Sequence, residues 1–175
     1  SRLDHGIENL MIDAKGNVWF SRITWANDNF FLGKFDGQKF THYTSSNGLF
    51  FSQINKIYED KDSIIWVGMT NGVLLKIEGD ECTYITPKEG MLLADINDIV
   101  ESEQDEIWLA TSAGALLFEN EEWKYAKFGS ELRSAKINKI HKDYRGNLWL
   151  CKNDGISILT KGSIITLDSS NGLLG

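Results

Sequence analysis

Few residues in this chain could act as bases or metal ligands. The histidines are His5, His42 and His141, and none stands at metal-ligand spacing from another histidine or from a carboxylate. General acid–base or metal-assisted catalysis needs a positioned base and a group that stabilises the charge developing on the substrate. The sequence shows no such pair, so we predict no catalytic residue, no metal site and no cofactor.

Cysteine and charge patterns narrow the possible partners. Cys82 and Cys151 have no motif spacing, which speaks against a disulfide framework and a thiolate metal site. The formal net charge is −7 and no run of lysine or arginine offsets it, so neither nucleic acid nor an anionic membrane surface is expected as a partner. No stretch approaches the roughly 20 apolar residues of a membrane helix, and residues 1–10 do not read as a signal peptide.

An internal repeat is the main signal in the sequence. Four tryptophans recur at spacings of 47, 42 and 41 residues: Trp19, Trp66, Trp108 and Trp149. An apolar residue stands nine residues before each of them, at Leu10, Ile57, Ile99 and Ile140, and another twelve before, at Ile7, Ile54, Ile96 and Ile137. Glycine follows the last three by six residues, at Gly72, Gly114 and Gly155. Positions that keep phase across the whole chain indicate repeated structural units.

The second unit shows best what one repeat builds. Four short strands are expected at 54–59, 64–69, 73–77 and 81–86, and Asn71-Gly72 favours a tight hairpin between the second and third. Four antiparallel strands in about 40 residues is typical of a propeller blade. We therefore predict an all-β fold of four β-propeller blades, with repeats at about 1–47, 48–89, 90–130 and 131–175. A β-sandwich is the alternative, but it gives no reason for tryptophan and glycine to recur in register.

The repeat also makes a prediction about the two ends of the array. Ser1, Gly48, Gly90, Glu131 and Gly172 are equivalent positions, so the chain holds four repeats and the first residues of a fifth. All four strands of each blade come from one continuous stretch of the chain, so no strand joins the first blade to the last. The outer faces of these two blades should therefore be the apolar surfaces that neighbouring blades bury elsewhere. We expect a partial propeller completed by further blades or by a second copy of the chain. A closed ring of four blades is the alternative.

A ligand site is predicted where the first repeat departs from the others. Its interval is longer by five residues, and matching Lys34 with Lys76 places the insertion between Ser21 and Phe31. Aromatic rings beside amide and charged groups suit a sugar or peptide ligand. The candidate residues on this face are Trp25, Asn27, Asp28, Phe50, Phe51 and Arg133. Alternatively, the apolar ones simply cover a neighbouring blade.

Polar positions on the first strand of each blade are candidates for lining a central channel. They stand ten residues before each repeat tryptophan, at Asn9, Lys56, Asp98 and Lys139. A channel needs solvated residues in any case, so a binding role is only one interpretation.

The repeat register also assigns packing roles. Each repeat tryptophan is expected to be buried against the apolar residue nine positions before it. His141 aligns with Met11, Tyr58 and Val100, and Cys151 aligns with small residues, so both are expected to pack in the interior.

Two families of propeller are similar to these repeats. Residues 54–60, 65–68 and 71–73, followed by Tyr84-Ile85-Thr86 and Gly90-Met91, resemble the two-component regulator propeller repeat. In the first unit, residues 16–20 and 32–37 resemble the related streptogramin lyase repeat.

The two resemblances imply different functions. The first implies the ligand-sensing or interaction propeller of a bacterial two-component protein, periplasmic or extracellular, with a small-molecule or oligosaccharide ligand. The second implies an enzyme fragment, a carbon-oxygen lyase that uses histidine and a metal ion. No residue here matches the lyase's catalytic histidine-glutamate arrangement. A purely structural scaffold is the third alternative.

Overall fold

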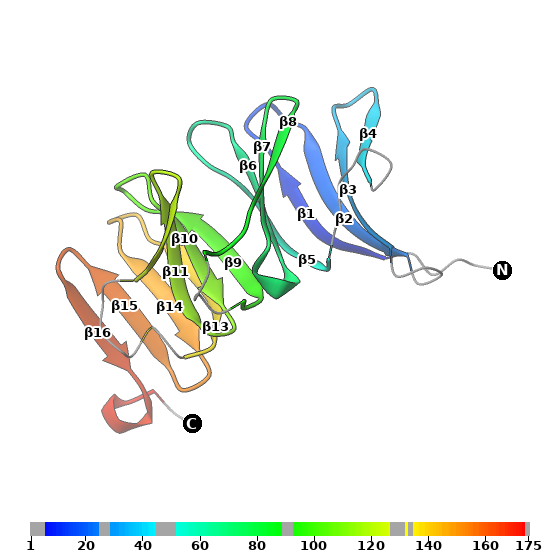
Figure 1. Cartoon of the computed structure of the whole chain (residues 1–175). Helices are drawn as coiled ribbons and strands as arrows, with labels where there is room; N and C mark the ends of the chain where they lie inside the picture. Colours follow the sequence, from blue (N-terminus) through cyan, green and yellow to red (C-terminus); the bar gives the residue numbers. More distant parts are fainter. Residues whose placement is uncertain are drawn as a thin grey trace.

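The chain folds into four separate antiparallel sheets that stand side by side as blades (Figure 1). This computed structural model describes residues 6–24, 29–44, 52–88, 93–126, 132 and 135–173, with only the backbone at 23, 24 and 29–31. The first two blades are built from β1 (Ile7–Ile12), β2 (Val18–Thr24), β3 (Asn29–Phe35), β4 (Phe40–Tyr43), β5 (Ile54–Glu59), β6 (Ile65–Met69), β7 (Leu74–Glu78) and β8 (Glu81–Ile85). The other two are built from β9 (Ile96–Glu101), β10 (Ile107–Thr111), β11 (Gly114–Glu119), β12 (Glu122–Tyr125), β13 (Ile137–Lys142), β14 (Leu148–Lys152), β15 (Ile156–Thr160) and β16 (Ser163–Leu167).

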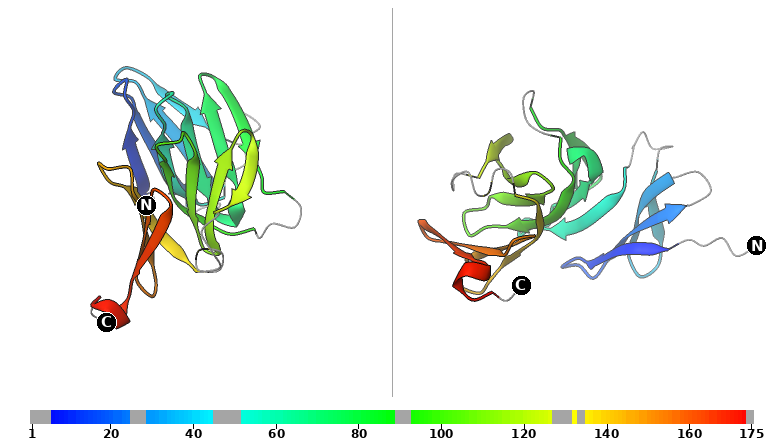
Figure 2. Two further views of the ribbon diagram at one scale, coloured as in Figure 1. Left: turned by 90° about the vertical axis from the view of Figure 1, so that its left-hand side faces the viewer. Right: turned by 90° about the horizontal axis from the view of Figure 1, so that it is seen from below.

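The predicted all-β architecture is confirmed. Within each blade the strands follow one another in chain order, as in β1-β2-β3-β4. The first strands β1, β5, β9 and β13 lie inside, each packed on the next, and the blades fan out around them (Figure 2). Short helical turns occur at η2 (Thr70–Gly72) and η4 (Ser169–Asn171). No helix in the described ranges is long and apolar enough to span a membrane.

Apolar cores form between consecutive blades, with a tryptophan of one blade in each. Trp19 is buried with Ile54 and Ile57 of the second blade, and Trp66 is buried with Ile96 and Ile99 of the third. Trp108 is likewise buried among apolar residues of the fourth blade. The hydrophobic free energy of the array is therefore concentrated at the blade-to-blade contacts.

This arrangement corrects the expected partner of each tryptophan. Val67, the neighbour of Trp66, pairs with Ile57 across the hairpin. Because side chains alternate between the two faces of a sheet, Trp66 and Ile57 lie on opposite faces. Trp19, Trp66 and Trp108 therefore pack against the next blade, whereas Ile57, Ile99 and Ile140, each nine positions before a repeat tryptophan, pack against the previous one. Trp149 has no following blade among the described residues and is only partly buried, so the expected burial is wrong for this tryptophan.

The two outer faces of the array carry exposed apolar side chains. Ile7 is 55% exposed and Leu10 is 65% exposed, while the equivalent Ile54 and Ile57 are 2% and 4% exposed. On the fourth blade, Ile165 is 49% exposed. Consistent with the prediction, the surface that an adjoining blade buries elsewhere in this array is open to solvent at both of its ends.

Two packing predictions fail on the outer face of the fourth blade. Cys151 is exposed, and so is His141 on β13. The aligned residues Met11, Tyr58 and Val100 are partly or fully buried because a following blade lies beside them. No such blade covers β13 and β14 in the described part of the chain.

The turn between the first and second strands is held by a repeated carboxylate. Asp60 Oδ2 accepts a hydrogen bond from Trp66 Nε1 at 2.7 Å, and its Oδ1 accepts from the backbone N–H groups of Asp62 and Ile64. Asp13 and Asp143 make the equivalent bonds to the tryptophans of their blades. In the third blade Ser102 stands in place of the aspartate, and Glu106 accepts the tryptophan N–H instead, at 2.9 Å. The ring of each repeat tryptophan is thus fixed in position by a nearby carboxylate.

Candidate functional site

The six predicted ligand-binding residues, Trp25, Asn27, Asp28, Phe50, Phe51 and Arg133, lie outside the described residues. What the structure does describe is the hairpin around the insertion. β2 and β3 each have seven residues, whereas β6 and β7 each have five. Lys34 pairs with Trp19 and Lys76 pairs with Trp66. The alignment that located the insertion is therefore confirmed, and the ligand site itself stays a prediction.

The predicted channel positions lie on the inner strands, and Asp98 has the most contacts among them. It is 4% exposed. Its Oδ1 lies 2.7 Å from Lys56 Nζ on the second blade and accepts the backbone N–H of Ile99 at 3.1 Å. Its Oδ2 accepts the N–H of Ile140 on the fourth blade at 3.2 Å. One nearly buried carboxylate thus joins three consecutive blades. Lys139, in contrast, is exposed.

A series of asparagine amides joins the inner strands in the same direction along the chain. Asn55 Nδ2 donates to the Ile96 carbonyl at 3.1 Å, and Asn97 Nδ2 donates to the Ile137 carbonyl at 2.8 Å. In the first blade Asn9, another predicted channel position, donates to the Ile54 carbonyl at 2.7 Å. Asn138, the equivalent in the fourth blade, donates to Asn153 Oδ1 of its own blade at 2.9 Å. These polar contacts fix the register of one blade against the next.

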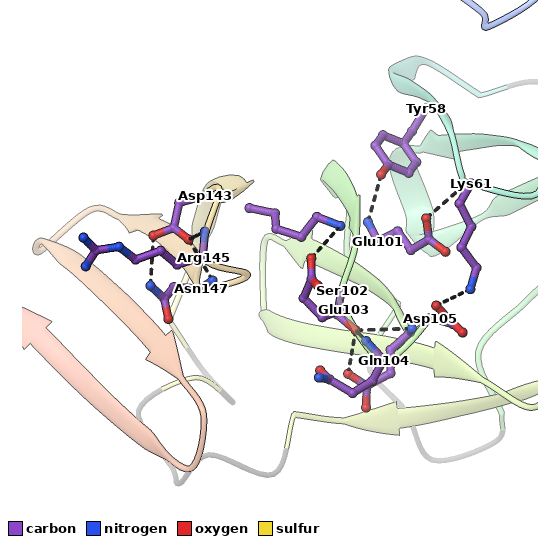
Figure 3. Close-up of polar contacts among 12 residues, drawn as sticks. Tyr58, Lys61, Glu101, Ser102, Glu103, Gln104, Asp105, Asp143, Arg145 and Asn147 are labelled. Atoms are coloured by element: carbon purple, nitrogen blue, oxygen red, sulfur yellow. Dashed lines mark hydrogen bonds and ion pairs between the residues drawn. The ribbon is translucent and has the colours of Figure 1, made fainter.

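The opposite ends of the strands form the turn face, defined by residues 13–17, 60–64, 102–106 and 143–147. Carboxylates of one blade bind the turn of the blade before it. Glu101 Oε2 accepts the N–H of Lys61 at 2.9 Å, and the backbone N–H of Glu101 donates to the Tyr58 hydroxyl at 3.1 Å (Figure 3). Burial raises the pKa of the Tyr58 hydroxyl above its ordinary value. Glu59 binds the N–H of Ala14 in the same way.

Two of the turn carboxylates, Asp13 and Asp143, have lowered pKa values because they accept several hydrogen bonds. At Asp143 the bond from Trp149 is the largest influence on the pKa, and together with bonds from Asn147 and Arg145 it holds the pKa well below the usual range. Figure 3 shows the contacts of Asp143 with Asn147 and Arg145. At Asp13 burial raises the pKa, but the hydrogen bonds to the carboxylate outweigh it and the net shift is downward.

A cavity of about 400 Å³ opens on the turn face between the third and fourth blades. We call it the interblade cavity. Its apolar floor consists of Trp108, Leu117, Leu148 and Leu159. Its rim consists of Ser102, Glu103, Gln104, Glu106, Glu119, Lys124, Gly146, Thr160, Lys161 and Gly162. None of the described residues that were singled out in the sequence as ligand-binding or channel-lining candidates lines this cavity. No group of three or more His, Cys, Asp or Glu residues suited to a metal ion occurs in the described segments.

One segment of the repeat matches a known protein family. Residues 48–71, which hold β5, β6 and the turn between them, match the family model described as two component regulator propeller. The predicted resemblance to this repeat is confirmed. No curated protein matches the chain as a whole.

Solved structures with the same blade arrangement include an enzyme and extracellular domains. A catalytically inactive virginiamycin B lyase from Staphylococcus aureus, solved with quinupristin, has a TM-score of 0.73 at 14% identity over 96% of this chain and 57% of that one. The extracellular domain of BT3049 from B. thetaiotaomicron, described as a hybrid two component system, has a TM-score of 0.65 at 22% identity over 95% of this chain and 29% of that one. The corresponding domain of BT4673 has a TM-score of 0.72 at 17% identity over 94% and 23%.

The chain therefore spans somewhat more than half the length of the lyase and about a quarter of each extracellular domain. At these identities the likeness establishes the propeller fold, and fold does not decide between an enzyme and a sensor.

Proposed function

We propose that this chain is a ligand-sensing or interaction segment of the propeller of a bacterial two-component signalling protein, located in the periplasm or outside the cell. The match of residues 48–71 to the two-component regulator propeller repeat carries the proposal, because it is a likeness in sequence as well as in fold. The blade arrangement shared with extracellular domains described as parts of two-component systems supports it.

The proposed ligand is an oligosaccharide or a short peptide bound at the inserted loop. Titration of the purified chain with a panel of both, followed by tryptophan fluorescence, should give a saturable signal that Trp25→Ala removes. Tyr144→Ala provides a matched control, because Tyr144 is an aromatic residue of the turn face that is 89% exposed. If the Trp25→Ala and Tyr144→Ala chains bound equally well, the site would have to lie elsewhere.

The location is tested separately in the cells that produce the protein. Protease added to cells whose outer membrane has been permeabilised should degrade the segment, while a cytoplasmic marker protein survives. Protection of the segment until the cells are lysed would contradict the proposal.

A streptogramin lyase-like activity is the second candidate, and the fold likeness to virginiamycin B lyase is the observation that favours it. We expect no activity from this segment. The described histidines, His42 on β4 and His141 on β13, are both exposed and lie on the first and last blades. Incubation with quinupristin followed by chromatography is the direct test. Ring opening by elimination gives an isomer, so retention time and not mass reports the reaction.

A further inference from the structure

The gap between successive blades on the turn face is filled differently at each of the three contacts. Between the first and second blades, Lys34 Nζ lies 5.2 Å from the ring centroid of Trp19, and only about 60 Å³ stays open. Between the second and third blades, Phe118 packs on Trp66 at 5.8 Å between ring centroids, and Trp123 packs on Phe118 at 5.7 Å. Large side chains therefore occupy the first two gaps.

The third gap lacks both kinds of filler. Leu117 pairs with Trp108 as Lys34 pairs with Trp19, so a leucine stands where the first blade has its lysine. Leu159 and Ile164 pair with each other as Phe118 and Trp123 do. Smaller side chains at these positions leave the interblade cavity of about 400 Å³. Its size lies at the lower end of the range for sites that bind small organic molecules.

Polarity and charge narrow the class of molecule that fits. The floor is apolar and almost fully buried, with Trp108 at 4% and Leu159 at 5% exposure. The cavity lies between two facing sheets, with Trp108 and Leu117 on the third blade and Leu148 and Leu159 on the fourth. A flat molecule inserted there would lie along both sheets and contact the Trp108 ring.

The acidic groups at the rim already have partners. Glu119 lies 2.6 Å from Lys124 Nζ, and Glu103 lies 3.5 Å from Lys142 Nζ. Glu106 accepts hydrogen bonds from Trp108 Nε1 and from the Ser102 hydroxyl. Lys161 is a third lysine beside Lys124 and Lys142. The three positive charges equal in number the negative charges of the three glutamates. A charged ligand would have to break one of these pairings, whereas a neutral one would not.

We propose that the interblade cavity is a binding site for a neutral, planar, mainly apolar small molecule that packs on Trp108. The site lies on the turn face, remote in the chain from the insertion where the sensing ligand is proposed. The inference does not depend on a signalling role, because it follows from the packing of the third blade on the fourth.

The test uses three probes that share a para-methylphenyl group and are similar in size: p-cresol, which is neutral, 4-methylbenzoate, which is an anion, and 4-methylbenzylamine, which is a cation at pH 7. The chain has six tryptophans, so a nitrogen-15 NMR spectrum shows six indole N–H signals at most. Trp108→Phe identifies the Trp108 signal by its loss. We expect p-cresol to shift that signal with a dissociation constant of about 1 mM, as is ordinary for a ligand of this size. The two charged probes should bind at least fivefold more weakly.

The chain itself supplies the blocking variants. Leu159→Phe copies Phe118 of the third blade, and Leu117→Lys copies Lys34 of the first. Each should abolish the shift at Trp108. The thermal unfolding midpoint should stay the same or rise for Leu159→Phe, which fills the cavity, and should fall for Leu117→Lys, which places an ammonium group where the leucine is 3% exposed. Ile165→Phe is the matched control, because it adds the same ring on the opposite face of the fourth blade, where Ile165 is 49% exposed.

Several outcomes would overturn the proposal. They are the absence of any shift at Trp108 with 10 mM p-cresol, equal binding of the charged probes, and undiminished binding by a folded Leu159→Phe or Leu117→Lys chain. None of these results bears on binding at the inserted loop, so failure here and failure of the proposed sensing function can be told apart.

Discussion

Two isosteric substitutions in the turns should differ sharply in their cost, because the two carboxylates use their oxygens differently. Asp60 accepts hydrogen bonds on both oxygens: Oδ2 binds Trp66 Nε1, and Oδ1 binds two backbone N–H groups. Glu106 accepts both of its donors, Trp108 Nε1 and the Ser102 hydroxyl, on the single oxygen Oε2. Asp60→Asn must place an amide N–H₂ against one set of donors, whereas Glu106→Gln can keep its oxygen where it is needed.

The magnitude follows from these contacts. In Asp60→Asn either the buried Trp66 N–H or two backbone N–H groups lose their acceptor and face another donor. A hydrogen bond to a charged group contributes about 1.5–3 kcal/mol, and an unsatisfied buried donor costs about 1–3 kcal/mol. We therefore expect Asp60→Asn to lower the free energy of unfolding by about 2–4 kcal/mol. For Glu106→Gln both bonds persist in neutral form, and the expected loss is less than about 1 kcal/mol.

Urea denaturation followed by circular dichroism measures both variants. Asp62→Asn is the matched control, because Asp62 belongs to the same turn and its exposed side chain faces solvent. The shift in midpoint should be large for Asp60→Asn and small for the other two. Equal losses for Asp60→Asn and Glu106→Gln would refute the assignment of acceptor oxygens, and an unchanged midpoint for Asp60→Asn would refute the role of the turn altogether.

The remaining predictions concern the inner strands, the outer faces and acid stability. Asp98→Ala should destabilise the chain by about 2–4 kcal/mol, because the buried backbone N–H groups of Ile99 and Ile140 lose their acceptor and the partly exposed Lys56 loses its ion pair, and urea unfolding of the variant measures this. The chain should self-associate through its exposed first-blade face, and Leu10→Glu should weaken this association; sedimentation equilibrium showing only 19.8 kDa monomer for the original chain would contradict it. The pKa values of Asp13 and Asp143 lie below 3.8 in the folded chain, so their stabilisation is complete above that pH and is lost as the pH falls below it. Unfolding midpoints measured from pH 7 to pH 2 test this, and in the Asp13→Asn variant the midpoint should fall less steeply as the pH drops below 3.8.

The strands of the second blade could be predicted closely from sequence. The ranges expected at 54–59, 64–69, 73–77 and 81–86 differ from β5 to β8 by one residue at most at any boundary. In this blade, glycine and other turn-forming residues separate the apolar runs, so the ends of the strands can be located. Gly72, Gly114 and Gly155 all have positive φ, at 72°, 125° and 149°, so the recurring glycine marks a real conformational requirement.

Contacts between blades were harder to predict, because they depend on which face of a sheet a residue occupies. Each repeat tryptophan and the apolar residue nine positions before it stand on two strands joined by a hairpin. Because Ile57 pairs with Val67, Ile57 lies on the opposite face of the sheet from Trp66. The exposure of His141 and Cys151 depends on what lies beside the fourth blade, and their repeat position contains no such information.

Two further patterns in the sequence mark polar contacts that the repeat analysis had not predicted. An aspartate stands six residues before the tryptophan in three of the four repeats, and an asparagine stands eleven residues before it in the last three. The first pattern locates the carboxylate that fixes each indole ring, and the second locates the amides that join the inner strands.

The interblade cavity shows why the repeat alone could not reveal a site. Blade-to-blade register is set near the inner strands, by amides such as Asn55 and Asn97 and by the carboxylate of Asp98. Because those contacts hold the blades together, the side chains that meet farther out can change size without moving either sheet. Leu117 in the third gap is equivalent to Lys34 in the first, and Leu159 in the third is equivalent to Phe118 in the second. The open volume is about 60 Å³ in the first gap and about 400 Å³ in the third. A binding site on such a scaffold therefore arises where a repeat position loses bulk, on the turn face and away from the contacts that stabilise the fold.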